Sequence, residues 1–124
     1  MDMSKEVRIA NDLTSRWAQA FGARDLDGLA ALYAPEVLFF GSTPQLFRGH
    51  EGVRAYFAGL PAAVALETFE ELELVHVAPG VFAAAGFFRF RLGAEALRFR
   101  LTWVVVSRDG GWVIAQHHAA RCDA

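Results

Sequence analysis

Residues Phe99–Val106 read FRLTWVVV, residues Ser107–Gly111 read SRDGG, and residues Trp112–His118 read WVIAQHH. An Asp-Gly pair between two apolar runs predicts a β-hairpin, because a two-residue type I′ turn needs positive φ at both central residues. Side chains alternate along a strand, so we expect His117 and His118 to face opposite sides of the sheet. At most one of them can line an interior pocket, and the pair cannot chelate one metal.

The pattern upstream of this hairpin is also extended, from about Leu66 onward. Turn signals at Pro79-Gly80, at Gly93 and at Asp109-Gly110 divide this half of the chain into four strands. The predicted strands lie at 66–78, 81–92, 95–106 and 111–119. Turns this short join antiparallel neighbours, so we expect a four-strand meander.

The first helix is predicted to run from Ser4, its expected N-cap, to about Gly22. Its apolar residues recur at every fourth position, which is one stripe of an amphipathic helix: Ile9, Leu13, Trp17 and Phe21.

A second helix is expected to be capped by Asp25, to bury residues as far as Tyr33, and to end before Pro35. A short strand at 37–40 and a third helix at 49–60 should follow. Helices first and strands afterwards predict an α+β fold, with three N-terminal helices packed on a curved, mainly antiparallel sheet.

The composition indicates one domain, residues 1–124, with a large apolar core or a shared apolar face. The chain has 124 residues, of which 54% are hydrophobic, and a net charge of −2. We expect no nucleic-acid partner, because phosphate binding needs clustered Lys and Arg. We expect no membrane partner either, since no apolar stretch approaches the ~20 residues of a spanning helix. The lone Cys122 and the polar N-terminal segment favour a cytoplasmic protein.

The order of these elements resembles the nuclear transport factor 2-like superfamily, whose fold is a cone formed by a curved sheet wrapped over helices. The resemblance covers nearly the whole chain and rests on 17–35, 47–53 and 108–112. The ending Trp112–His118 is most similar to bacterial relatives of the calcium/calmodulin-dependent kinase II association domain, and also to SnoaL-like proteins. This superfold hosts isomerases, cyclases, dehydratases, binding proteins and oligomerisation hubs, so it implies a fold more than a function.

The resemblance also implies which site patterns are incomplete. Ketosteroid isomerases of this fold need a carboxylate base, whose position falls here at Gly41. They also need two acidic donors, whose positions fall at Trp17 and Thr102. We therefore expect no ketosteroid isomerase activity. In the association domain the pocket is lined by arginines; one matches Arg89, whereas the others fall at Trp103 and Ala119.

His117 is the candidate catalytic residue, because the resemblance places residues 103 and 119 on the pocket face and His117 shares their parity. An imidazole in an apolar cone could act as acid, base or donor near neutral pH. The alternative is a hydrogen-bonded histidine at a strand end or a dimer seam. We expect the ligand-binding residues to be Trp17, Phe21, Ser42, Tyr56, Phe87, Arg89 and Trp103. No cluster has metal-ligand spacing, so we expect neither a metal nor a cofactor.

Two functions stay open at this stage. One is a small-molecule pocket protein, which could be a cofactor-free isomerase, cyclase or dehydratase that acts on a hydrophobic substrate and uses His117 for proton transfer. The alternative is a non-catalytic ligand-binding or oligomerisation domain of the association type. Apolar residues on both faces of strands 81–92 and 95–106 predict a homodimer through the outer face of the sheet.

Overall fold

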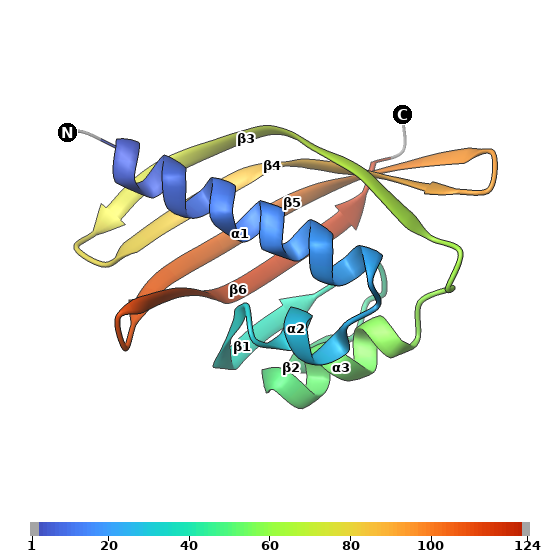
Figure 1. The fold of residues 1–124 in the computed structure, drawn as a ribbon, viewed down its shortest axis with the longest axis horizontal. Helices are drawn as coiled ribbons and strands as arrows, with labels where there is room; N and C mark the ends of the chain where they lie inside the picture. The colour runs from blue at the N-terminus through green and yellow to red at the C-terminus, as the bar shows by residue number, and fades with distance from the viewer. Residues whose placement is uncertain (1–2, 123–124) are drawn as a thin grey trace.

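The computed structural model describes residues 3–122, and Figure 1 shows an α+β fold with helices packed on one mixed, mostly antiparallel sheet. The elements are α1 (Ser4–Gly22), α2 (Leu26–Ala30), β1 (Tyr33–Phe40), β2 (Leu46–Arg48), α3 (Gly49–Ala58), β3 (Ala65–Ala78), β4 (Val81–Leu92), β5 (Glu95–Arg108) and β6 (Gly111–Arg121). The strand order is β2-β1-β6-β5-β4-β3. The predicted meander of four strands is therefore confirmed, and β1 joins it in parallel with β6.

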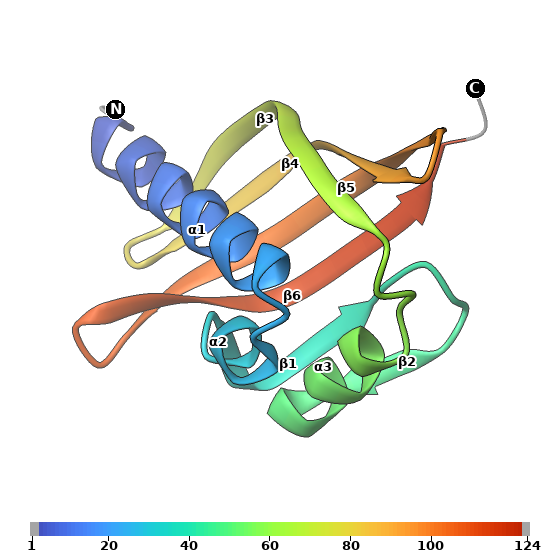
Figure 2. The same ribbon diagram turned by 45° about the vertical axis from the view of Figure 1, so that its right-hand side comes forward.

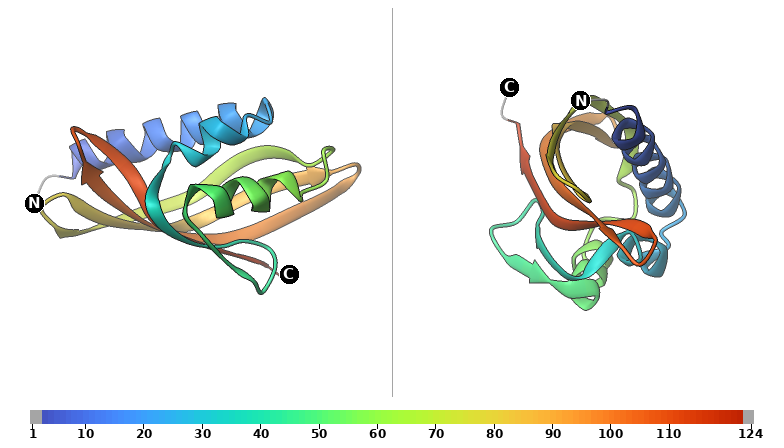
Figure 3. Two further views of the ribbon diagram at one scale, coloured as in Figure 1. Left: turned by 90° about the horizontal axis from the view of Figure 1, so that it is seen from below. Right: turned by 90° about the vertical axis from the view of Figure 1, so that its left-hand side faces the viewer.

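The helices divide between two places on the sheet. Figures 1 and 2 show α1 lying across one face of the sheet, whereas α2 and α3 gather with β1 and β2 at one end. We call the face under α1 the inner face and the opposite one the outer face. The sheet curls around α1, as the end-on view of Figure 3 shows. This curvature leaves room between the sheet and α3, and the site lies there.

Three of the four residues of the predicted α1 stripe, Leu13, Trp17 and Phe21, are almost fully covered, whereas Ile9 is half-buried. Glu6 is also buried, and its carboxylate lies 3.0 Å from Nδ1 of His76 on β3. This polar contact fixes the start of α1 against the edge strand. Ser4 is the first helical residue rather than the N-cap, a position that Met3 occupies without a side-chain hydrogen bond.

The second helix is shorter than the sequence suggested. Asp25 caps it as expected, because its side chain accepts a hydrogen bond from the backbone N–H of Gly28. However, α2 ends at Ala30, and Tyr33 begins β1 instead of closing the helix. Pro35 lies inside β1, where the pairing with β6 is interrupted between Tyr33 and Leu38. A strand tolerates proline at such an irregularity because no ladder hydrogen bond is required there.

The hairpin that ends the chain has the predicted turn, with φ of 52° at Asp109 and 80° at Gly110. It also contains a β-bulge that the sequence did not reveal. Ile114 lies opposite Val105 and Gln116 lies opposite Val104, so Ala115 has no partner on β5. The extra residue reverses the alternation of side chains, and Ile114 and His117 are therefore both buried.

Candidate functional site

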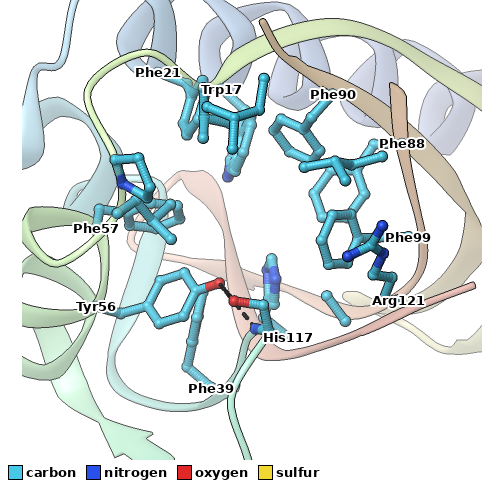
Figure 4. Close-up of a pocket in the computed structure, with 17 residues that line it drawn as sticks. Trp17, Phe21, Phe39, Tyr56, Phe57, Phe88, Phe90, Phe99, His117 and Arg121 are labelled. Carbon is cyan, nitrogen blue, oxygen red and sulfur yellow. Dashed lines mark hydrogen bonds between the residues drawn. The ribbon is translucent and has the colours of Figure 1, made fainter. Parts of the chain in front are cut away.

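A cavity of about 290 Å³ opens between α1, α3 and the inner face of the sheet. Its size is near the lower end of the range of about 300–1,000 Å³ typical of small-molecule sites. Figure 4 shows that aromatic side chains from both layers form most of its wall. The apolar aromatic rings are those of Trp17, Phe21, Phe39, Phe57, Phe88, Phe90 and Phe99.

Few polar side chains reach this cavity. Among the described residues that line it, the polar groups not already named belong to Ser42, Tyr56, His117 and Arg121, and none of the lining residues carries a carboxylate. Arg121 is more than half exposed, and its guanidinium lies 3.8 Å from the Glu95 carboxylate. The deep polar group is therefore His117, whose residue surface is only 2% exposed.

Three buried side chains, those of Trp103, Tyr33 and Phe39, contact the imidazole ring of His117. The indole N–H of Trp103 donates to Nδ1 of His117 over 3.0 Å, and the hydroxyl of Tyr33 lies 3.0 Å from the same nitrogen. The indole N–H of Trp17 donates to the Tyr33 oxygen over 2.9 Å. The ring of Phe39 stacks on the imidazole at 4.1 Å between centroids. Side chains from three elements, α1, β1 and β5, thus fix the histidine ring on β6.

This network determines the tautomer of His117. An indole N–H can only donate, so Nδ1 must be the acceptor. Because Nδ1 then carries no hydrogen, the Tyr33 hydroxyl 3.0 Å away can bond to it only as a donor, sharing the lone pair with the Trp103 indole. Burial raises the pKa of the Tyr33 phenol and keeps that proton in place. The neutral imidazole must therefore carry its proton on Nε2.

The Nε2–H of His117 is open to the cavity. Within residues 3–122, every fully buried polar side-chain atom has a hydrogen-bond partner, whereas Nε2 of His117 has none. Nε2 is therefore not fully buried. His117 also lines the cavity, and Figure 4 shows its ring between Tyr56 and Phe99. Burial, with a smaller effect of the neighbouring His118, lowers the pKa of His117 to about 3. Near neutral pH the group is an uncharged hydrogen-bond donor.

Gly41 and Tyr56 form the other polar corner. A Cβ atom at Gly41 would lie 2.2 Å from Cζ of Tyr56, so the tyrosine ring fills the space that a side chain at position 41 would need. The Tyr56 hydroxyl accepts a hydrogen bond from the backbone N–H of Ser42 and lies 2.9 Å from the Ser42 hydroxyl. The Tyr56 hydroxyl and Ser42 thus supply the polar groups at this corner, where position 41 itself has no side chain.

The structure brings five of the eight predicted site residues to the cavity wall: Trp17, Phe21, Ser42, Tyr56 and His117. Trp103 is buried directly behind His117 and contacts it through the indole N–H. His118 is exposed on the other side of the strand, beside Phe40. The expected opposition of the two histidines is therefore confirmed.

Phe87 and Arg89 do not reach the cavity, which corrects the placement expected for them. Trp103 lies opposite Ala84, and directly opposite residues share a face, so Phe88 and Phe90 point inward. The guanidinium of Arg98 covers Phe87 on the outer face, at 3.7 Å from the ring centroid. Arg89 pairs there with Glu70 at 3.3 Å, and this contact lowers the pKa of the Glu70 carboxyl.

Sequence reasoning missed several residues of the site. Tyr33 was assigned to the buried side of a helix, although it supplies the hydroxyl next to His117. Phe88 and Phe90 could have been found from the two-residue turn after Leu92, which pairs Leu92 with Glu95 and thereby sets the register of the hairpin. For Phe39 the sequence carried no signal beyond its place in an apolar strand.

No group of three or more His, Cys, Asp or Glu side chains within 3–122 is arranged to hold a metal ion. No helix in the same range has the length and hydropathy needed to cross a membrane.

A curved sheet closed by helices around an apolar cavity defines a small α+β domain of the nuclear transport factor 2-like type. The family model of the SnoaL-like domain matches residues 10–121, and the chain belongs to this family. A search of curated proteins found no significant match.

Solved structures share this fold at low sequence identity. A putative calcium/calmodulin-dependent protein kinase II association domain from Xanthomonas campestris is 20% identical, with a TM-score of 0.80 over 99% of this chain and 90% of the other. An NTF2-like protein of unknown function from Pseudomonas putida KT2440 is 23% identical, with a TM-score of 0.81 over 97% and 88%. A putative dehydratase of the NTF2-like family from Streptomyces avermitilis is 14% identical, with a TM-score of 0.83 over 99% and 100%. These likenesses establish the fold.

Proposed function

We propose that this protein binds a small hydrophobic molecule in the cavity between α1, α3 and the sheet. The observation that carries the proposal is a cavity of about 290 Å³ walled by aromatic rings, with one oriented donor, the Nε2–H of His117, at its deep end. Apolar pockets with a few convergent polar groups are typical of small-molecule sites. Burial of a ligand against these rings would supply the affinity, and His117 would orient it.

Binding without proton transfer fits His117 better than acid–base catalysis. A general base needs a free lone pair, but Nδ1 already accepts from Trp103 and Nε2 holds the proton. The low pKa of about 3 means that the imidazole stays uncharged near neutral pH and has no readily lost proton to give. The described lining residues also include no carboxylate that could take the role of base.

A cofactor-free isomerase, cyclase or dehydratase is the second candidate, and the fixed Nε2–H favours it. A neutral histidine can polarise a carbonyl and stabilise the negative charge that develops on its oxygen. Such a reaction begins with transfer of a proton next to the carbonyl to a base, which here would be a water molecule, since the described lining residues include no carboxylate. Exchange of the methyl protons of 2-acetylnaphthalene in D2O, followed by NMR, tests it. Exchange above the buffer rate that is lost in His117→Gln would favour an enzyme.

The binding proposal is tested by filling the cavity. Ala119 is buried on its wall, whereas the adjacent Ala120 lies on the outer face of β6. We expect ¹⁵N-labelled protein to bind 2-isopropenylnaphthalene, with shifts at the Trp17 indole. In Ala119→Leu the larger side chain would occupy part of the space that the probe needs. Binding should therefore weaken by at least about tenfold, which corresponds to a loss of ~1.4 kcal/mol. The matched control Ala120→Leu should bind as the unchanged protein does. Equal affinity in both variants, or no binding at millimolar probe, would refute the proposal.

A further inference from the structure

The contacts behind His117 decide what kind of polar group a ligand can place in front of it. Trp103 and Tyr33 both direct hydrogens at Nδ1, so the imidazole offers a donor to the cavity and no acceptor. Rotation of the ring by half a turn would leave both buried donors without a partner, and an unpaired buried donor is costly. The buried hydrogen bonds of Trp103 and Tyr33 to Nδ1 therefore determine the direction of the Nε2–H. This step rests on the proposed function, because it concerns the ligand of the same cavity.

The other polar groups of the cavity do not alter this preference. The hydroxyls of Ser42 and Tyr56 lie 2.9 Å apart and already bond to one another. Arg121 is the one described cation on the lining, and its side chain is 54% exposed and 3.8 Å from the Glu95 carboxylate. A positive charge is thus found at the exposed margin rather than at the deep end.

A charged acceptor is disfavoured beside His117. The imidazole is uncharged, because burial lowers its pKa to about 3, and its surroundings are aromatic. An anion placed there would lose its hydration without meeting an opposite charge, which costs far more than one hydrogen bond returns. A neutral acceptor loses less hydration and recovers one well-oriented hydrogen bond.

We propose that the ligand carries a neutral carbonyl oxygen, as in a ketone, aldehyde or ester, which accepts a hydrogen bond from Nε2 of His117. Its apolar body would lie against Trp17, Phe88 and Phe90. Trp103 and Tyr33 are positioning residues, since they act on the ligand only through the imidazole.

The first experiment compares three probes of nearly the same shape by NMR titration. 2-Acetylnaphthalene has the carbonyl oxygen, 2-isopropenylnaphthalene replaces that oxygen by CH₂, and 2-naphthoate replaces the methyl ketone by a carboxylate. We expect the ketone to bind about tenfold more tightly than the alkene, because the alkene leaves the buried N–H without an acceptor. The carboxylate should bind most weakly. Ketone and alkene should become equal in His117→Phe.

The second experiment measures the tautomer directly and does not depend on a variant that folds poorly. Long-range ¹H–¹⁵N spectra of the histidine-labelled protein should show His117 protonated on Nε2 alone. In Trp103→Phe the preference for the ketone should fall at least about threefold, because only one donor then holds the ring. Trp112→Phe is the matched control, since it removes an indole that makes no hydrogen bond with His117, and it should keep the preference.

Each result has a definite meaning. If 2-acetylnaphthalene and 2-isopropenylnaphthalene bind with equal affinity to the unchanged protein, the cavity binds apolar molecules but the inference about the carbonyl is wrong. Tighter binding of 2-naphthoate, or an Nδ1–H tautomer, would also overturn it. If none of the three probes binds, the proposed function fails and this inference fails with it.

Discussion

His117 couples the site to the acid stability of the fold. Burial lowers its pKa from 6.5 to about 3, so the unfolded chain binds a proton between these values that the folded protein does not. The contribution of His117 to the free energy of unfolding should therefore be fully present above pH 6.5 and should decrease as the pH falls towards 3. The expected loss from this group between pH 7 and pH 4.5 is about 3 kcal/mol.

Urea denaturation at the two pH values measures this loss. His117→Gln is the comparison, because the glutamine amide does not titrate and its oxygen can still accept from Trp103. We expect the pH dependence of His117→Gln to be shallower by about 3 kcal/mol over the same interval. An identical dependence in both proteins would show that His117 is not buried in its neutral form.

Tyr33 links Trp17 to His117, and its hydroxyl is the part that matters. Tyr33→Phe keeps the ring but leaves the buried indole N–H of Trp17 without its acceptor. We expect unfolding to become easier by about 1–3 kcal/mol, the usual cost of one unpaired buried donor. Tyr56→Phe is the control, because its hydroxyl bonds Ser42 in a more exposed setting, and it should lose less stability. A loss no larger than the control's would contradict the network described here.

His117 points inward, as its shared parity with residues 103 and 119 indicated. Strict alternation counted from Trp112 would instead place His117 on the face of Val113 and Ala115, opposite Ile114. The bulge at Ala115 interrupts that count, and Ile114 and His117 share the inner face. The family resemblance referred to residues 103 and 119, which lie beyond the bulge, and so it gave the right face. A one-residue bulge has no signature in an apolar strand, so periodicity could not have located it.

The strands of the meander were predicted to within about two residues because their turns are chemically explicit. Pro79-Gly80 and Asp109-Gly110 allow few alternatives, and Gly80, Gly93 and Gly110 all adopt positive φ. The faces of β4 were harder to predict. Phe87 and Phe88 are adjacent and both aromatic, so alternation within β4 did not indicate which of them faces inward. The answer depended on the register with β5, which the two-residue turn at Gly93-Ala94 sets.

Gly86 lets β3 bend across β4. The pairing of these strands shifts between Glu70 and Glu73, and a Cβ at Gly86 would lie 2.8 Å from the Cα of Leu72. Because the clash is with backbone, the strand must move to relieve it. We expect Gly86→Ala to lower the free energy of unfolding by about 1–3 kcal/mol in urea titrations.

The matched control for Gly86→Ala is Gly22→Ala. Gly22 ends α1, and a Cβ there would meet no atom within 4 Å. Alanine favours helix over glycine by up to about 1 kcal/mol, so this variant should be unchanged or more stable. If both variants respond alike, close packing at the β3 bulge is not what requires glycine at position 86.

At the scale of the whole molecule, we propose a homodimer formed through the outer face of the sheet. Val75 and Val77 on β3 are 58% and 59% exposed, which is unusual for large apolar side chains in a strand. Val75 lies opposite Ala83, and Ala83 lies opposite Val104, so an apolar row crosses three strands of this face. α1 covers the inner face and leaves this row without intramolecular cover.

Light scattering at micromolar concentration should therefore report twice the mass of one chain. The double variant Val75→Glu, Val104→Glu should be a monomer, because buried unpaired carboxylates would oppose association. Val7→Glu is the control, since Val7 is 43% exposed on α1, away from this face, and it should stay dimeric. A monomeric unchanged protein would refute the proposal, and a ring of more than two subunits would support the likeness to the association domain.

The parallel pairing of β1 with β6 has a consequence for the order of events during synthesis. β1 emerges from the ribosome well before its partner β6, because four strands and α3 are made between them, and Phe39 pairs with His117. Contacts so distant in sequence close slowly, because the loop entropy is lost before they form. Until β6 arrives, the nascent chain exposes the rings of α1 and β1 without a completed sheet to cover them. We expect this interval to be when the polypeptide most needs a chaperone, and the cavity to take shape only after β6 has been made.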